Sequence, residues 1–138
     1  MAGLGRFARA TLLGSLAPAY AALSAGDPGD SFATMNEPTL GSNGYARQAI
    51  TWSAAAVPAT GARALLQNSN VITFTSTGVW NPSIAISHVA VMSNTSGNTE
   101  SSFVGICVLS PARLVDRAGI VITIPAGALE LSIGLIGG

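Results

Sequence analysis

The sequence predicts an all-β protein, an antiparallel β-sandwich of the jelly-roll kind with a short N-terminal helix or arm. From Tyr45 onward, short runs rich in β-branched and aromatic residues recur, each bounded by Gly, Pro, Asn or Ser. No long helical pattern separates these runs, so a parallel βαβ arrangement is not expected. A length of 138 residues suits one sandwich with a single core and leaves no room for a second domain.

The N-terminal segment favours a short helix over residues 3–16, which Pro18 should end. Apolar side chains recur there near helical spacing, at Leu4, Phe7, Leu12 and Leu16. The segment imitates a secretory signal peptide, but we expect it to stay on the protein. It is too short and too interrupted to span a bilayer. We therefore divide the chain into a helix or arm at 1–16 and a sandwich domain at 17–138.

About seven strands are expected along the rest of the chain. The first covers 19–25 and ends at the turn-forming sequence GDPGDS, which is followed by a polar loop up to Gly44. Polar residues at 93–102 predict an exposed hairpin loop between two later strands. The six later strands are expected at 46–52, 71–75, 84–92, 103–109, 120–124 and 129–135.

Charge is sparse and balanced in this chain. Only 9% of the residues are charged, and six arginines, with no lysine, offset six carboxylates to a formal net charge of +0. Binding to a phosphate backbone requires a basic excess, so no nucleic acid partner is expected, and no segment predicts a membrane partner. Arginine is tolerated at protein interfaces better than lysine, and 49% of the residues are apolar. These features predict a surface partly covered by copies of the chain or by neighbours.

No catalytic constellation is found, so we expect no enzyme, no cofactor and no metal site. The chain has one histidine, His88, and one cysteine, Cys107, and its carboxylates are scattered. Asp27 and Asp30 share one loop, which a solvated turn explains better than a calcium site. Cys107 is expected to be a buried thiol in a strand.

Two sets of residues are singled out as structurally or functionally important. Tyr45, Trp80 and His88 are candidate core residues, with His88 expected to be a hydrogen-bonded structural imidazole. Arg47 could make a fork-like bond to an adjacent subunit, or it could stay exposed on a solvated strand. The other candidate interface residues are Leu4, Phe7, Leu12, Leu13 and Leu16.

The apolar side chains of this N-terminal set are too many for a segment outside the β core unless something covers them. We expect the segment to dock against a neighbouring chain, either another copy or the shell of a larger particle. The alternative is that it folds back as a short helix onto one end of its own sandwich.

Four motifs occur in a characteristic order. They are GYARQ at 44–48, a strand ending near Trp80, ISH at 86–88 and PAGAL at 125–129. In this order and spacing, over roughly residues 17–135, the chain resembles small bacteriophage virion proteins of the tail-fibre-like or capsid decoration (cement) family. It departs from them at LVDRAGIVITIP, which lacks a Gly-Asp pair common in the family, and in its Ala-rich N-terminal segment.

The resemblance implies a virion structural protein built as a trimeric β-sandwich. We expect a capsid decoration protein that binds the major capsid protein on the outer capsid surface as a homotrimer and stabilises the shell. The alternative is a tail or tail-fibre component that contacts the host. Decoration is preferred because the sequence shows no extended shaft, coiled coil or internal repeat.

Overall fold

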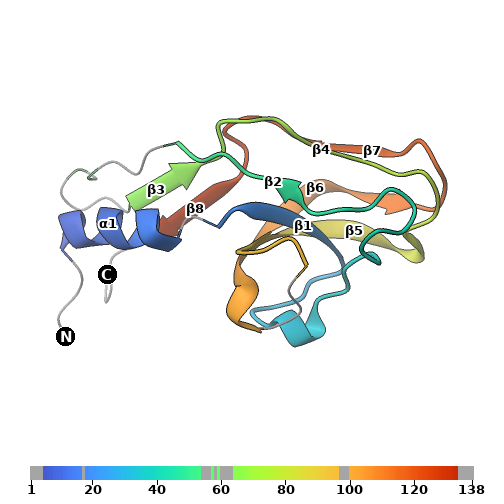
Figure 1. Ribbon diagram of the computed structural model, residues 1–138, viewed down its shortest axis with the longest axis horizontal. Helices are drawn as coiled ribbons and strands as arrows, with labels where there is room; N and C mark the ends of the chain where they lie inside the picture. The colour runs from blue at the N-terminus through green and yellow to red at the C-terminus, as the bar shows by residue number, and fades with distance from the viewer. Residues whose placement is uncertain are drawn as a thin grey trace.

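The computed structural model describes residues 5–16, 18–53, 57, 59, 64–96 and 100–133. These residues form antiparallel sheets with one short N-terminal helix, which confirms the predicted all-β sandwich. Figure 1 shows the helix α1 (Arg6–Leu16) beside strands β3 and β8 at one end of the long axis. The remaining strands lie toward the other end.

One layer of the sandwich is a four-stranded sheet with the order β2-β1-β5-β6. Its strands are β1 (Tyr20–Ala25), β2 (Gln48–Ala49), β5 (Asn81–Met92) and β6 (Phe103–Val115). Every residue of β1 after Tyr20 is buried, and β5 is buried from Val89 to Met92. These two strands are central, and strands covered on both faces carry continuous apolar runs.

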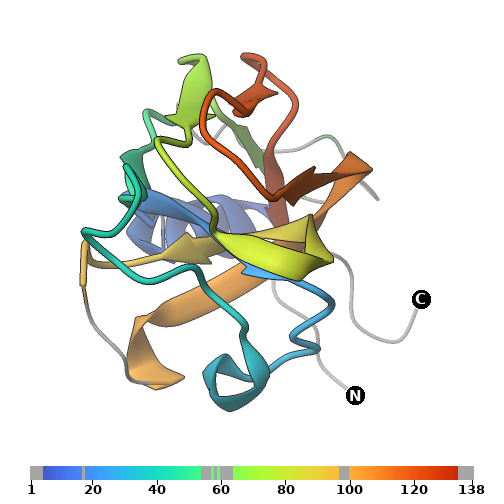
Figure 2. The ribbon, with the colours of Figure 1, turned by 90° about the vertical axis from the view of Figure 1, so that its right-hand side faces the viewer.

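The opposing layer consists of two separate antiparallel pairs. Strand β4 (Ile72–Thr75) pairs with β7 (Val121–Ile124), and β3 (Ala64–Gln67) pairs with β8 (Glu130–Ile133). In the β4 and β7 pair, buried and exposed residues alternate, as expected for a layer with one face on the core and one in solvent. Figure 2 looks along the long axis and shows this layer above the four-stranded sheet.

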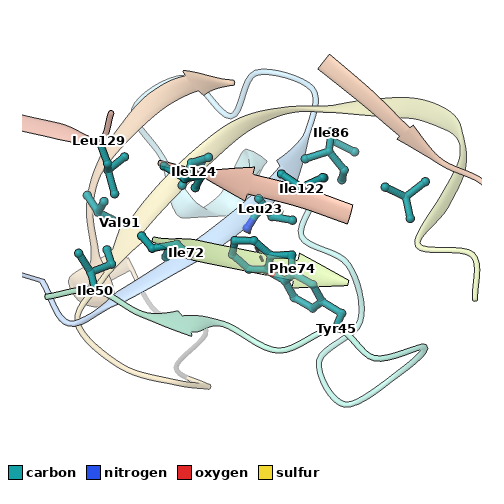
Figure 3. Close-up of a cluster of buried hydrophobic side chains, with 14 residues drawn as sticks. Leu23, Tyr45, Ile50, Ile72, Phe74, Ile86, Val91, Ile122, Ile124 and Leu129 are labelled. Carbon is teal, nitrogen blue, oxygen red and sulfur yellow. Dashed lines mark hydrogen bonds between the residues drawn. The ribbon is translucent and has the colours of Figure 1, made fainter. Parts of the chain in front are cut away.

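The main core lies between the two layers and is shown in Figure 3. The Tyr45 ring stacks on Phe74 with centroids 6.2 Å apart, and the Trp80 ring meets Tyr45 edge-on at 5.3 Å. Such aromatic pairs add about 0.5–1.5 kcal/mol beyond the burial of their area. The other labelled side chains around them are Leu23, Ile50, Ile72, Ile86, Val91, Ile122, Ile124 and Leu129.

Helix α1 packs through one narrow face onto the β3 and β8 pair. Arg9, Ala10 and Leu13 are its buried residues, and Leu13 joins Ala64 and Leu66 in a second, smaller core. The predicted helix is therefore present, and its apolar side chains are shared between its own chain and the surface. No helix within the described ranges is long and apolar enough to cross a membrane.

The largest difference from the predicted elements is strand β3, which the sequence did not indicate. Its residues, ALLQ, include no β-branched or aromatic side chain and follow an Ala-rich stretch, so they lack the usual strand signal. Pairing with β8 and burial against α1 impose the extended conformation. The tertiary context here overrides local propensity.

The predicted strand at 46–52 shortens to β2 and a single bridge between Trp52 and Asn68. Side chains replace strand pairing there, since the Thr51 backbone N–H donates to Asn70 Oδ1 at 2.8 Å. Conversely, β5 and β6 are longer than predicted, and the predicted loops contain two short 3₁₀ helices, η1 (Phe32–Thr34) and η2 (Glu100–Ser102). Residues 3–4 and 134–135 of the predicted helix and last strand lie outside the described residues.

Candidate functional site

A largely buried polar cluster, here called the Glu37 clamp, joins the loop that precedes β2 to the loop that follows β5. It consists of Glu37, Tyr45, Arg47 and Asn94. The Glu37 carboxylate accepts from Tyr45 Oη at 2.8 Å, from Arg47 Nε at 2.8 Å and from Arg47 Nη2 at 2.7 Å. Arg47 Nη1 donates to the Asn94 carbonyl oxygen at 3.2 Å and to Asn94 Oδ1 at 3.0 Å. The clamp thus fixes the loop before β2 against the loop after β5.

Tyr45 extends the same cluster into the central strand. Its hydroxyl accepts from the Leu23 backbone N–H at 2.9 Å while it donates to Glu37. Burial is the main reason that the pKa of Tyr45 is raised well above its usual value, and the negative charge of Glu37 adds to this effect. The hydrogen bond to Glu37 is the main reason that the pKa of Arg47 is raised. The clamp therefore holds a neutral phenol beside a charged guanidinium and carboxylate.

The position of Arg47 differs from both alternatives that the sequence left open. Its side chain is 0% exposed, and its fork-like bond is made to Glu37 of the same chain rather than to a neighbouring subunit or to solvent. Neither Glu37 nor Asn94 is among the candidate residues that the sequence suggested. The available signal was weak: Glu37 is one of only six carboxylates and lies ten positions before the arginine that it binds.

The three candidate core residues occupy different environments. Tyr45 is fully buried in the main core, whereas Trp80 is half-buried against it and donates from Nε1 to the Asn43 carbonyl at 2.8 Å. His88 is half-buried on β5, where it pairs with Ser24 of β1 and Val108 of β6. Its Nδ1 lies 2.8 Å from Ser87 Oγ, and its Nε2 lies 3.8 Å from Asp27 Oδ1. His88 is thus a half-buried side chain with polar partners on a central strand of the sheet.

The candidate interface residues of the N-terminal segment divide between two roles. Leu13 is buried against its own chain, whereas Phe7, Leu12 and Leu16 are exposed by 71%, 42% and 46%. At 3.6 residues per turn, Leu12 and Leu16 lie together on one flank of the buried face and Phe7 lies on the other. Leu4 lies outside the described residues. The N-terminal helix therefore folds back onto its own chain and also leaves part of its apolar surface uncovered.

Cys107 is half-exposed rather than buried as the sequence predicted. Its Sγ lies 3.6 Å from the Glu130 carbonyl oxygen, and partial burial raises the pKa of the thiol. It lines a shallow hollow of about 220 Å³ between β6 and the end of β7, together with Val89, Leu109, Ile124 and Leu129. Within the ranges that the structure describes, no group of three or more His, Cys, Asp or Glu side chains is placed to hold a metal ion.

Residues 4–132 match a protein family described as podophage GP4 fiber I protein gp80. The chain belongs to this family. Membership in the fiber I protein gp80 family makes it a structural protein of a phage virion, which confirms this coarser part of the resemblance. Comparison with curated proteins and with solved structures gave no match.

Proposed function

We propose that the protein is a fibre subunit on the surface of a podophage virion. The observation that carries this proposal is the family match over nearly the whole chain, because the family is described by its fibre role. The proposed role is structural and involves no catalysis. The geometry supports it through a rigid sandwich that the Glu37 clamp ties together from within.

Two surfaces suit the two contacts that a fibre subunit needs. Helix α1 lies at one end of the long axis and exposes Phe7, Leu12 and Leu16. A separate surface carries the loops of η1 and η2, where the Glu100 carboxylate accepts from the Phe32 backbone N–H at 2.8 Å and from Ser31 Oγ at 3.2 Å. We assign assembly with other subunits to the apolar helix end. We assign contact with the host surface to the polar loops.

The assembly contact that we propose is a homotrimer formed around α1. Leu12 and Leu16 are four residues apart on one flank, the spacing by which helices pack against one another. Helix α1 carries no acidic residue, and its charges are Arg6 and Arg9. A second copy of the same helix is a suitable partner, because the contact is made by apolar side chains and does not depend on a carboxylate of the partner.

Capsid decoration is the second candidate function. It is supported by the shape of the described residues, which form one sandwich and a short helix without a coiled coil or a repeated shaft. In this role the trimer would sit on the outer capsid surface, with the major capsid protein beneath it.

Locating the protein on intact particles tests both functions. We expect a gold-labelled antibody, or a cryo-electron microscopy map of the particle, to place a few copies at the fibres. Labelling in hundreds of copies across the whole shell would instead establish decoration. Particles that lack the protein would contradict both.

A further inference from the structure

Strand β6 begins with an uninterrupted apolar run at the edge of its sheet. Residues 103–109 read FVGICVL and contain no charged or hydrogen-bonding polar side chain other than the weakly polar thiol. Runs of this kind are typical of strands that are covered on both faces and paired on both edges. Here, however, β6 is the outermost strand of its sheet. None of the seven residues is buried, and Val108 is 74% exposed.

The outer edge of β6 is protected most in its second half. Between the pairs His88↔Val108 and Ile86↔Arg113, β6 has more residues than β5, so the strand bulges there, and Pro111 lies within the bulge. Bulges, prolines and charges are the means by which edge strands avoid pairing with another chain. The register also shifts at the start of the strand, between the pairs Met92↔Phe103 and Val91↔Gly105, but residues 105–109 carry no bulge, proline or charge. Their edge is therefore suited to pair with an additional strand.

The sequence of this run identifies its own partner. When FVGICVL is laid antiparallel on a second copy with Ile106 at the centre, Val104 faces Val108 and Gly105 faces Cys107. Phe103 then faces Leu109, and no charge meets another. A contact around a two-fold axis requires such a self-complementary patch. We propose that residues 103–109 pair with the same residues of a second copy, around a two-fold axis at Ile106.

This pairing joins two four-stranded sheets into one continuous sheet. Main-chain hydrogen bonds along the edge supply the affinity, and the apolar cross-strand pairs set the register. The contact uses a surface different from helix α1 and does not depend on a fibre role. With the proposed trimer it gives assemblies of six copies, and without the trimer it gives dimers.

Disulfide trapping tests the register of the proposed pairing. In the full-length Cys107→Ser protein, we would compare Ile106→Cys with the control Arg113→Cys, which lies on the same strand. Directly opposite residues have Cβ atoms about 4.5–5.5 Å apart, close enough for a disulfide to form with a small adjustment. The two copies of residue 113 would lie about 46 Å apart at about 3.3 Å per residue. We expect a cross-linked dimer from Ile106→Cys and only background from Arg113→Cys.

A charge on the edge tests whether the pairing forms in solution. Val108→Lys should be accepted by the single chain because the side chain is largely exposed, but it places an ammonium opposite Val104 of the second copy. We expect light scattering to show half the wild-type mass with an unchanged melting temperature. The control Val121→Lys, on exposed β7, should keep the full mass. The proposal would be overturned if Ile106→Cys gave no cross-link above the Arg113→Cys background, or if Val108→Lys kept the wild-type mass. Either result is also expected if β6 pairs with a different protein, and it would overturn the proposal in that case too.

Discussion

At the scale of single residues, the Glu37 clamp shows how one largely buried carboxylate can hold Tyr45 and Arg47, which in turn bond to β1 and to the loop after β5. Glu37 receives three hydrogen bonds, and the Tyr45 hydroxyl both accepts and donates. Buried polar groups are tolerated when they are paired in this way, and they become costly when one partner is lost. The clamp residues should therefore affect stability more than their number suggests.

Breaking the ion pair from one side should strongly destabilise the fold. We expect Arg47→Met to lower the free energy of unfolding by about 3–5 kcal/mol, because it leaves Glu37 charged and buried without its cation. The double variant Glu37→Leu with Arg47→Met should recover much of the loss. The control Arg117→Met removes an arginine paired with exposed Asp116 and should cost about 0–1 kcal/mol. Urea titration measures all three, and a loss as small as that of the control would contradict a structural role for the clamp.

Removing the Tyr45 hydroxyl tests the second part of the clamp. Tyr45→Phe leaves the Leu23 N–H without its acceptor and Glu37 with one donor fewer, so a loss of about 1–3 kcal/mol in unfolding free energy is expected. The conservative control is Tyr20→Phe on half-buried Tyr20, for which we expect a change within about 0.5 kcal/mol. Equal stability of the two variants would argue against the assigned hydrogen bonds.

The stability of the protein should also fall at alkaline pH. The pKa of Tyr45 is raised in the folded state above its usual value of 10.0, so its contribution is complete below about pH 10 and is lost as the pH rises further. Between the unfolded and folded pKa values, this one group lowers the free energy of unfolding by about 1.4 kcal/mol per pH unit. The pKa of Cys107 is also raised in the folded state, so both proteins should be compared in a Cys107→Ser background. There, unfolding measured between pH 9 and 11 should depend less on pH in Tyr45→Phe, and an unchanged slope would contradict the cause assigned here.

At the scale of elements, α1 has an inner and an outer apolar face, and two adjacent leucines separate their roles. Leu13 is fully buried in the smaller core, and Leu12 is exposed. We expect Leu13→Ala to lower the free energy of unfolding by about 2–5 kcal/mol, the range for truncating a buried leucine. Leu12→Ala should change it by less than about 0.5 kcal/mol. Thermal melts compare the two, and a similar cost for both would mean that the helix does not pack as described.

The turn before Tyr45 shows how local backbone geometry places a core residue. Asn43 and Gly44 both have positive φ angles, of 51° and 78°. A Cβ on Gly44 would lie 3.0 Å from the Thr75 carbonyl oxygen and 3.0 Å from Thr77 Cγ2, so glycine is required for both conformation and space. This tight turn directs Tyr45 into the core between Phe74 and Trp80.

At the scale of the whole molecule, the surface left uncovered by one chain predicts assembly. We expect the double variant Leu12→Ser with Leu16→Ser to remain folded and to lose the proposed trimer, because both side chains are exposed in the single chain. Light scattering should then report one third of the wild-type mass. The matched control is Thr11→Ser on exposed Thr11 of the same helix, which should keep the full mass. A wild-type protein that is monomeric at micromolar concentration would contradict the trimer.

Local signals in the sequence were sufficient to predict the class of the fold and most of its elements. Short runs rich in β-branched or aromatic residues between turn residues indicated β4, β5, β6, β7 and β8. The apolar run before the turn GDPGDS indicated β1, and helical spacing followed by Pro18 indicated α1. These features depend on local propensity and periodicity, which a single sequence records directly. The motifs at 44–48, 86–88 and 125–129 also indicated a phage virion protein, in agreement with the family.

The partners that these elements take depend on contacts that form in the folded chain. The ALLQ segment becomes β3 because β8 and α1 cover it, and Arg47 turns inward because folding brings Glu37 and Asn94 to its guanidinium. Likewise, the run at 103–109 is apolar enough for a central strand, yet the order of the sheet leaves it at an edge. Pairing of strands and burial of charges depend on contacts between residues far apart in the chain. Such contacts leave no periodic pattern in the sequence, which is why local signals predicted the strands but not their neighbours.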